Sequence, residues 1–184
     1  YIPEITPDMV REDADYVHIC YNNTIFGTKY PSVPNIGDKV LVADMSSCIL
    51  SEPVDVSKFG VIYAGAQKNM APAGLTVVIV REDLIGKSLP ETPTMLDYKV
   101  MADNGSMYNT PPCYSIYMAK LVYEWIISIG GLAEMKKRNE KKAALLYSYL
   151  DSQNYYKAPV EKSCRSMMNV TFVTGDPELD KKFA

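Results

Sequence analysis

The sequence predicts an α/β fold with a largely parallel sheet. Its first half alternates short apolar runs with turn residues, a texture typical of strands, and its second half carries two long stretches with helical periodicity. The apolar runs are nearly continuous, which favours strands covered on both faces, as in a parallel sheet. With 184 residues, 47% of them hydrophobic and 22% charged, the chain is long and apolar enough to bury a core.

Four apolar runs are the predicted strands. In chain order they are Tyr16–Cys20, Lys39–Ala43, Gly60–Ala64 and Gly74–Val80. The third and fourth runs lie too close in the sequence for a helical crossover, so we expect these two strands to be antiparallel neighbours.

Two helices should follow the strands. The first is expected over Cys113–Ile129, where an apolar stripe that includes Trp125 ends at Gly130 and Gly131. The second is expected over Leu132–Leu150, with its Lys-rich positions facing water.

The C-terminal part of the sequence changes texture again. A strand is predicted over Met167–Val173, and Asp176-Pro177 has the residue types of a helix cap and first turn. A helix that starts there has about two turns before the sequence stops, and the first residue is Tyr1 rather than Met. We therefore expect this sequence to be a piece of a larger protein.

Charge and hydropathy argue against several classes of function. The formal net charge is −3, and the one dense basic run, residues 136–142, is interrupted by Asn139 and Glu140, as a solvated helix face is. No apolar stretch approaches the roughly 20 residues needed to span a bilayer, and the N-terminus lacks a signal-peptide pattern. We therefore expect no nucleic-acid partner, no membrane contact and a cytoplasmic location.

The cysteines do not suggest a metal site. The four cysteines are scattered along the sequence: Cys20, Cys48, Cys113 and Cys164. Only one histidine, His18, is available as a further metal ligand. We therefore expect no metal and predict buried free thiols.

Two strand ends carry the side chains with the clearest chemistry. Lys68 follows the third strand, in a stretch whose small residues let another molecule approach the backbone. A lysine shielded from water favours its neutral amine, the form that attacks an aldehyde to give a Schiff base. Asp44 ends the second strand, where open α/β sheets gather ligand-binding groups, and could pair with a protonated pyridine nitrogen. The alternatives are a solvated lysine and a carboxylate that caps a turn.

Five stretches of the chain resemble the phosphoserine aminotransferase family, in the order that the family has them. They are residues 16–25, 41–47, 53–69, 74–81 and 107–112. The resemblance covers essentially the whole sequence but only about the middle half of a family member. It implies the three-layer α/β/α large domain of a fold-type I transferase over residues 1–153, and the start of a smaller α+β C-terminal domain over residues 154–184.

The resemblance also implies roles for individual residues. Lys68 is similar to the lysine that holds pyridoxal 5'-phosphate (PLP) as a Schiff base and carries the proton from the substrate's α-carbon, and Asp44 to the partner of the pyridine nitrogen. Thr24 resembles a threonine beside the ring hydroxyl, and Gln67 resembles a ligand of the cofactor phosphate. His18 matches no functional position, so we expect a structural role for it.

Asn109 and Thr110 resemble a pair that reaches across a dimer interface to the phosphate of the partner's cofactor. The resemblance therefore implies a homodimer with shared active sites. The implied reaction is reversible amino transfer between glutamate and 3-phosphohydroxypyruvate, which gives 2-oxoglutarate and phosphoserine in serine biosynthesis.

Some family features are altered in this sequence or fall outside it. Met70–Gly74 and Cys48 depart from the common pattern, which indicates a subgroup rather than lost chemistry. The family's phosphate loop, ring-stacking aromatic and terminal substrate arginine are not matched, so we expect the 184-residue chain alone to be inactive. Two rivals remain: another fold-type I PLP enzyme, such as a cysteine desulfurase or a different aminotransferase, and a non-catalytic fragment that keeps the fold.

Overall fold

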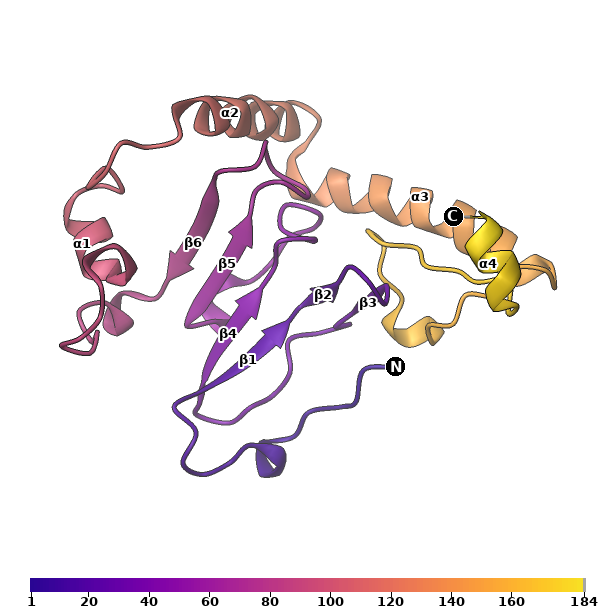
Figure 1. Cartoon of the computed structure of the whole chain (residues 1–184), viewed down its shortest axis with the longest axis horizontal. Helices are drawn as coiled ribbons and strands as arrows, with labels where there is room; N and C mark the ends of the chain where they lie inside the picture. The colour runs from indigo at the N-terminus through magenta and orange to yellow at the C-terminus, as the bar shows by residue number, and fades with distance from the viewer. Residues whose placement is uncertain (184) are drawn as a thin grey trace.

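The computed structural model describes residues 1–183. Its main sheet has four strands in the order β1-β4-β5-β6 (Figure 1). They are β1 Tyr16–Cys20, β4 Val40–Asp44, β5 Val61–Gly65 and β6 Thr76–Val80. β1, β4 and β5 run parallel, and β6 is antiparallel to β5. The α/β class, the mainly parallel sheet and the antiparallel last pair are confirmed; residue 184, the end of the predicted second domain, lies outside the described residues.

A small second sheet follows β1. β2 (Asn22–Asn23) and β3 (Thr28–Lys29) pair antiparallel. The sequence does not predict them, because two residues are too few to establish the alternating pattern of a strand. Their hairpin turn, residues 24–27, lies close to the carboxyl end of β1.

The two faces of the main sheet differ in burial. On one face Leu41, Ala43 and Ile62 are at most 3% exposed, and residues 30–36 and 45–59 pack against them. The side chains that point to the opposite face are half-buried or exposed. The expectation of two covered faces is therefore not met within residues 1–183, because the packed segments gather on one side.

Four α-helices complete the regular structure of residues 1–183. They are α1 Tyr98–Asp103, α2 Cys113–Ser128, α3 Gly131–Ser152 and α4 Pro177–Phe183. Short 3-10 helices cover Pro7–Met9, Val56–Lys58, Glu82–Leu84, Thr94–Leu96 and Lys162–Cys164. The predicted helices correspond to α2 and α3, and Asp176 caps α4 by accepting a hydrogen bond at Oδ1 from the Glu178 N–H over 2.9 Å.

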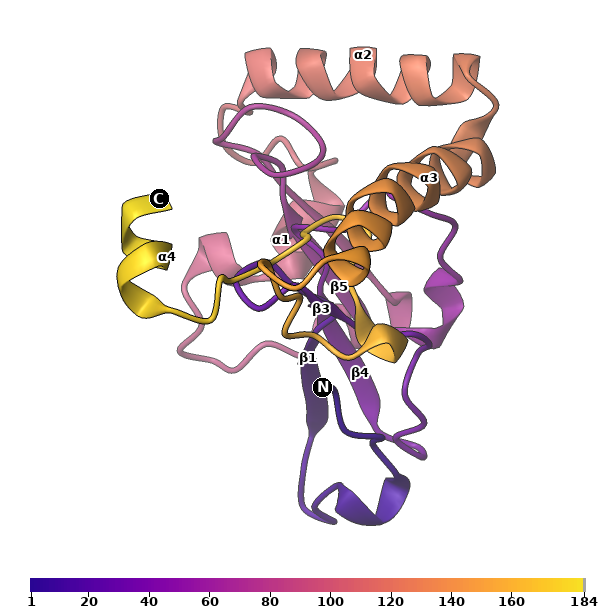
Figure 2. The same cartoon turned by 90° about the vertical axis from the view of Figure 1, so that its right-hand side faces the viewer.

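α2 lies beyond the end of the sheet to which β4 and β5 point (Figures 1 and 2). The Ser115 hydroxyl donates to the Ala73 carbonyl, and the Tyr123 hydroxyl contacts the Met70 sulfur, which fixes α2 over the loop after β5. Trp125, predicted in a core-facing stripe, is 50% exposed. Among the described helices none alone has the length and apolar composition to span a membrane; α2 and α3 reach both only when taken together, across an 86° bend.

The predicted strand over Met167–Val173 is wrong. Only one isolated bridge forms there, between Lys157 and Val173. The N–H groups of Met168 and Asn169 both donate to the Ser166 hydroxyl oxygen, which removes them from any strand pairing. The apolar composition of this segment therefore led to a wrong strand prediction.

The C-terminal segment is tied to the hairpin through buried polar groups. The Asn22 amide donates to Ser47 and Asn169, and the Ser166 hydroxyl donates to the Asn22 side-chain oxygen. Asn22 and Ser166 are at most 2% exposed. Because unpaired buried polar groups are costly, these bonds fix the segment against β2.

Candidate active site

The carboxyl ends of the three parallel strands meet at one edge of the main sheet. Cys20 of β1, Asp44 of β4 and Tyr63 of β5 are in register across the strands. The half-buried Asp44 carboxylate accepts a hydrogen bond at Oδ1 from the Ser46 N–H over 2.8 Å. This bond holds one carboxylate oxygen toward the turn that follows β4.

The turn after β5 carries Lys68. The N–H groups of Met70 and Ala71 both donate to the Ala66 carbonyl over 3.0 Å, which closes the turn. The Asn69 amide donates to the Ile49 carbonyl over 2.6 Å and attaches the turn to the segment after β4. Lys68 itself is exposed, so this chain does not supply the shielding from water that the sequence led us to expect.

The hairpin turn brings Thr24 to the lysine. Nζ of Lys68 donates to Oγ1 of Thr24 over 2.6 Å, across 44 residues of sequence. The turn keeps its shape because the Asn23 side-chain oxygen accepts from the N–H groups of Ile25 and Phe26. Thr24 therefore reaches Lys68 from a locally fixed backbone.

Gly27 closes the same turn in the left-handed region, with φ +68°. A Cβ there would lie 2.7 Å from the Asn169 carbonyl oxygen. This close approach places the C-terminal segment directly behind the turn that carries Thr24.

Gln67 lies beside Lys68 and folds back over the end of β5. A Cβ at Gly65 would lie 2.8 Å from Oε1 of Gln67, so a larger residue there would push the amide aside. The Gly65 N–H donates to the Ser46 hydroxyl over 3.0 Å, which joins the two strand-end turns. Lys68, Thr24, Gln67 and Asp44 thus gather at one sheet edge.

Cys20 reports the charges at this edge. Burial raises the pKa of the Cys20 thiol, the charge of Asp44 raises it further, and the charge of Lys68 acts in the opposite direction. The charges of Asp44 and Lys68 therefore both act on the Cys20 thiol. The prediction of buried thiols holds for Cys48 and Cys164 and is wrong for Cys20 and Cys113, which are exposed.

Asn109 and Thr110 lie apart from the other predicted site residues. Both are exposed on the segment between α1 and α2, which lies beyond the β6 edge of the sheet (Figure 1). Over residues 1–183 no hydrogen bond joins either side chain to Lys68, Thr24 or Asp44.

The sequence interpretation missed three contributors to the site. Ser46 connects the two strand-end turns, Cys20 borders both charges, and Tyr63 stands beside Asp44 in the register. The signal for Cys20 was its place at the end of a predicted strand, level with Asp44. Within the described chain no three His, Cys, Asp or Glu side chains gather as a possible metal site.

This arrangement combines an accessible primary amine, a half-buried carboxylate and two neutral hydrogen-bonding side chains. An amine can add to a carbonyl carbon, and a carboxylate can hold a proton on a basic ring nitrogen. The hydroxyl of Thr24 and the amide of Gln67 can bind oxygen atoms of a ligand without adding charge.

Comparison with known proteins gives one consistent family. Aminotransferase class-V matches residues 2–184. Phosphoserine aminotransferase of Hahella chejuensis is 54% identical over 182 residues, 99% of this chain and 50% of the relative. That of Listeria monocytogenes is 58% identical over 183 residues, 100% of this chain and 49% of the relative. The chain thus spans about half the length of the curated relatives it matches.

Solved structures give the same result for the fold. Phosphoserine aminotransferase from Bacillus circulans superimposes with a TM-score of 0.90 at 46% identity, over 95% of this chain and 48% of that one. The PLP-bound enzyme from Trichomonas vaginalis superimposes with a TM-score of 0.89 at 38% identity, over 95% of this chain and 50% of that one. Another phosphoserine aminotransferase, in a structure describing radiation damage of its Schiff base, gives 0.90 at 48% identity, over 95% of this chain and 49% of that one.

Proposed function

The chain belongs to the class-V aminotransferase family, and we propose that it carries the cofactor-binding lysine, Lys68, of a PLP-dependent phosphoserine aminotransferase. The reaction is reversible amino transfer between glutamate and 3-phosphohydroxypyruvate, as part of serine biosynthesis. The observation that carries the proposal is the accessible amine of Lys68, which contacts Thr24 at the edge of the sheet where β4 ends in Asp44.

The side chains at this edge fit PLP. The exposed amine of Lys68 is open to an aldehyde, and the half-buried carboxylate of Asp44 suits a protonated ring nitrogen. Gly65 leaves the space that the Gln67 amide occupies. When bound, PLP supplies an aldehyde carbon for the amine and a protonated ring that withdraws electrons from the substrate's α-carbon.

Each residue has a distinct task in this proposal. Nζ of Lys68 accepts the proton that leaves the α-carbon of glutamate and passes it to the cofactor. Asp44 keeps the proton on the ring nitrogen, and the Ser46 N–H orients its carboxylate. The Thr24 hydroxyl forms a hydrogen bond with the ring hydroxyl of the cofactor, and the Gln67 amide binds the cofactor phosphate.

Asn109 and Thr110 serve a neighbouring subunit in this proposal. Their exposed position away from Lys68 leaves them free to bind the phosphate group of a partner's cofactor. In this proposal the protein is a homodimer with shared sites, located in the cytoplasm. Residues 1–153 form part of its large domain, and residues 154–184 begin the small one.

A transamination assay tests the proposal. The complete polypeptide that carries this sequence, supplied with PLP, glutamate and 3-phosphohydroxypyruvate, should form 2-oxoglutarate, and Lys68→Ala should abolish its formation. Alanine as the amino donor, followed by pyruvate formation, tests a rival aminotransferase, and cysteine with a thiol reductant, followed by release of alanine and sulfide, tests a cysteine desulfurase. Faster turnover with either amino acid, or turnover that survives Lys68→Ala, would contradict the proposal.

The same assay on residues 1–184 alone addresses the rival of a non-catalytic fragment. We expect no measurable turnover from this chain even with saturating PLP, because a reacting group misplaced by about 1 Å can lose roughly 10²-fold in rate. Turnover within about tenfold of the complete polypeptide would show that residues 1–184 suffice.

A further inference from the structure

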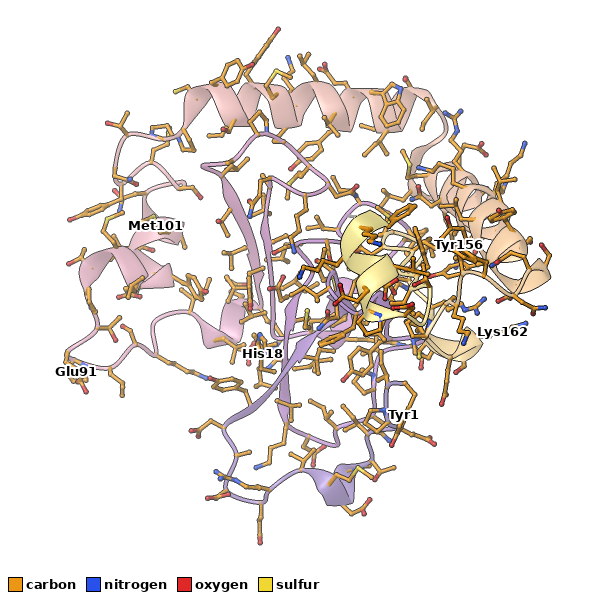
Figure 3. All side chains as sticks on the ribbon, turned by 45° about the vertical axis from the view of Figure 1, so that its right-hand side comes forward. Tyr1, His18, Glu91, Met101, Tyr156 and Lys162 are labelled. Atoms are coloured by element: carbon orange, nitrogen blue, oxygen red, sulfur yellow. The ribbon has the colours of Figure 1, made fainter. Side chains whose placement is uncertain are left out.

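His18, the one histidine of the chain, makes a specific contact across the open sheet face. Its Nε2 lies 2.9 Å from the Tyr63 hydroxyl, and the two rings stack with centroids 5.9 Å apart. His18 belongs to β1 and Tyr63 to β5, with β4 between them. The two side chains (His18 is labelled in Figure 3) therefore meet over β4, on the face that carries Asp44.

Tyr63 also faces Asp44. The two residues are partners in the β4–β5 register and point to the same face. Burial raises the pKa of Tyr63, and the charge of Asp44 and hydrogen bonding with its carboxylate raise it further. The Tyr63 hydroxyl thus lies against the His18 imidazole, on the sheet face to which Asp44 also points.

The ionised carboxylate fixes the direction of these contacts. A carboxylate can only accept hydrogen bonds, and a tyrosine hydroxyl has a single proton to donate. If that proton points to Asp44, the contact with His18 exists only when His18 Nε2 carries a proton and donates it to the tyrosine oxygen. The reverse direction would leave two oxygen lone pairs, those of Asp44 and Tyr63, facing each other.

We propose that Tyr63 and His18 are positioning residues for Asp44, joined in a one-way chain of hydrogen bonds from His18 Nε2–H to the Tyr63 hydroxyl and on to the Asp44 carboxylate. The proposal rests on the proposed role of Asp44 beside the cofactor ring. With the Ser46 N–H on one side and Tyr63 on the other, the carboxylate would be held in one orientation toward a cofactor ring nitrogen. This proposal gives His18 a functional role where the sequence led us to expect a structural one.

Other ionisable groups surround this chain of bonds. Cys20 and Lys68 lie on the Asp44 side. Asp15, Tyr16 and Tyr98 line the groove on the His18 side. Tyr16 is on the same strand and face as His18 but outside the chain of bonds, so it provides a matched control.

The state of the His18 ring tests the direction of the chain without the cofactor. ¹⁵N NMR of the complete, PLP-free polypeptide, with labelled histidine at a pH where imidazole is neutral, distinguishes protonated from unprotonated ring nitrogens; His18→Gln assigns the signals. We expect the proton on Nε2. In Asp44→Asn the amide oxygen should keep the Ser46 N–H, so its NH₂ group donates to Tyr63 and the hydroxyl turns to His18. The histidine proton should then move to Nδ1.

A proton on Nδ1 in the unaltered protein, or one that stays on Nε2 in Asp44→Asn, overturns the proposal. Because this measurement needs no PLP, it separates failure of the hydrogen-bond chain from failure of the proposed function. The latter is decided by whether Lys68 reacts with PLP.

Kinetics of the PLP-bound complete polypeptide test the consequence for Asp44. Tyr63→Phe should lower kcat about tenfold and leave the KM for glutamate within about twofold, because the substrate is not bound by Tyr63. His18→Phe should behave similarly, whereas His18→Gln should keep most of the activity, because its amide can donate in place of Nε2–H. Tyr16→Phe should match the unaltered protein. Equal losses in His18→Gln and His18→Phe, or a kcat for Tyr63→Phe within about twofold of normal, would contradict the proposal.

Discussion

Nζ of Lys68 and Oγ1 of Thr24 are 2.6 Å apart and share a hydrogen bond. Lys68 lies in the turn after β5, and Thr24 in the hairpin turn between β2 and β3. The bond joins turns that belong to two different sheets. It therefore fixes where the lysine amine points before any ligand arrives. Such preorganisation lowers the cost of ordering a flexible side chain on binding.

Thr24→Val tests this contact, since valine keeps the shape of threonine and removes the hydroxyl. We expect PLP to bind about three- to tenfold more weakly to the complete polypeptide, as follows from the loss of one hydrogen bond. Titration with PLP, followed by absorbance, measures the change. Thr28→Val is the matched control, because the described chain gives that hydroxyl no hydrogen bond. Equal affinities for the two variants would contradict the role of Thr24.

Asp44→Ala tests the electrostatic role of the carboxylate. A covalent link between PLP and the protein should still form, but transamination should slow by about 10²-fold or more, roughly 2.7 kcal/mol of barrier, because an unprotonated ring withdraws electrons poorly. Stopped-flow absorbance separates the two steps. Asp38→Ala, an exposed position just before the other end of β4, serves as the control. Near-normal turnover in Asp44→Ala would rule the role out.

The strands were predictable where apolar runs and burial coincide. Ile62 and Ala64 lie in the third predicted run and are 2% and 0% exposed. The Met167–Val173 run has the same local character but forms no strand, because Ser166 takes two of the backbone N–H groups. A run's composition does not say which partner its backbone will find, and that partner lies elsewhere in the chain.

The site was predictable to the extent that its residues end strands. Asp44 and Lys68 follow apolar runs, so topology alone brings them to one edge. The contact of Lys68 with Thr24 was not predictable from periodicity, because it depends on a hairpin with two-residue strands. The contact of His18 with Tyr63, 45 residues apart, depends on the strand order, which places β4 between them.

A complementation experiment tests the shared site. If Asn109 and Thr110 serve the partner subunit, a heterodimer of one Lys68→Ala subunit and one Asn109→Ala/Thr110→Ala subunit retains one intact site, as a two-fold interface permits. We therefore expect activity to return on mixing, toward half of normal per verified heterodimer, while each altered homodimer stays impaired. Mixing two preparations of Lys68→Ala is the control. No recovery in verified heterodimers would count against shared sites.

The ion pair between Asp151 and Arg165 predicts a pH dependence of stability. Two hydrogen bonds from the Arg165 guanidinium, 2.8 and 2.9 Å long, join the end of α3 to the following segment. Hydrogen bonding from Arg165, and then from Lys162, lowers the pKa of Asp151 from 3.8 to about 2. Because the folded state favours the ionised carboxylate, this stabilisation is present above about pH 4 and is lost as the pH falls through about 2.

Urea unfolding of the unaltered protein and of Asp151→Asn between pH 7 and pH 2 measures this effect. The unaltered protein should have the higher midpoint at pH 7, and the difference should shrink below about pH 4 and vanish near pH 2. Asp38→Asn, at an exposed position, should show no such convergence. A difference between the unaltered protein and Asp151→Asn that stays constant across this range would exclude the ion pair as its source.

The site of covalent attachment tests the central claim most directly. The complete polypeptide is incubated with PLP, reduced with borohydride to trap any carbon–nitrogen bond between the cofactor and a lysine, and digested for mass mapping. Lys68 should carry the pyridoxyl group, and Lys68→Ala should lose it while its far-UV circular dichroism and unfolding midpoint stay normal. A pyridoxyl group found mainly on another lysine of the unaltered protein, or undiminished labelling of Lys68→Ala, would contradict the assignment of Lys68.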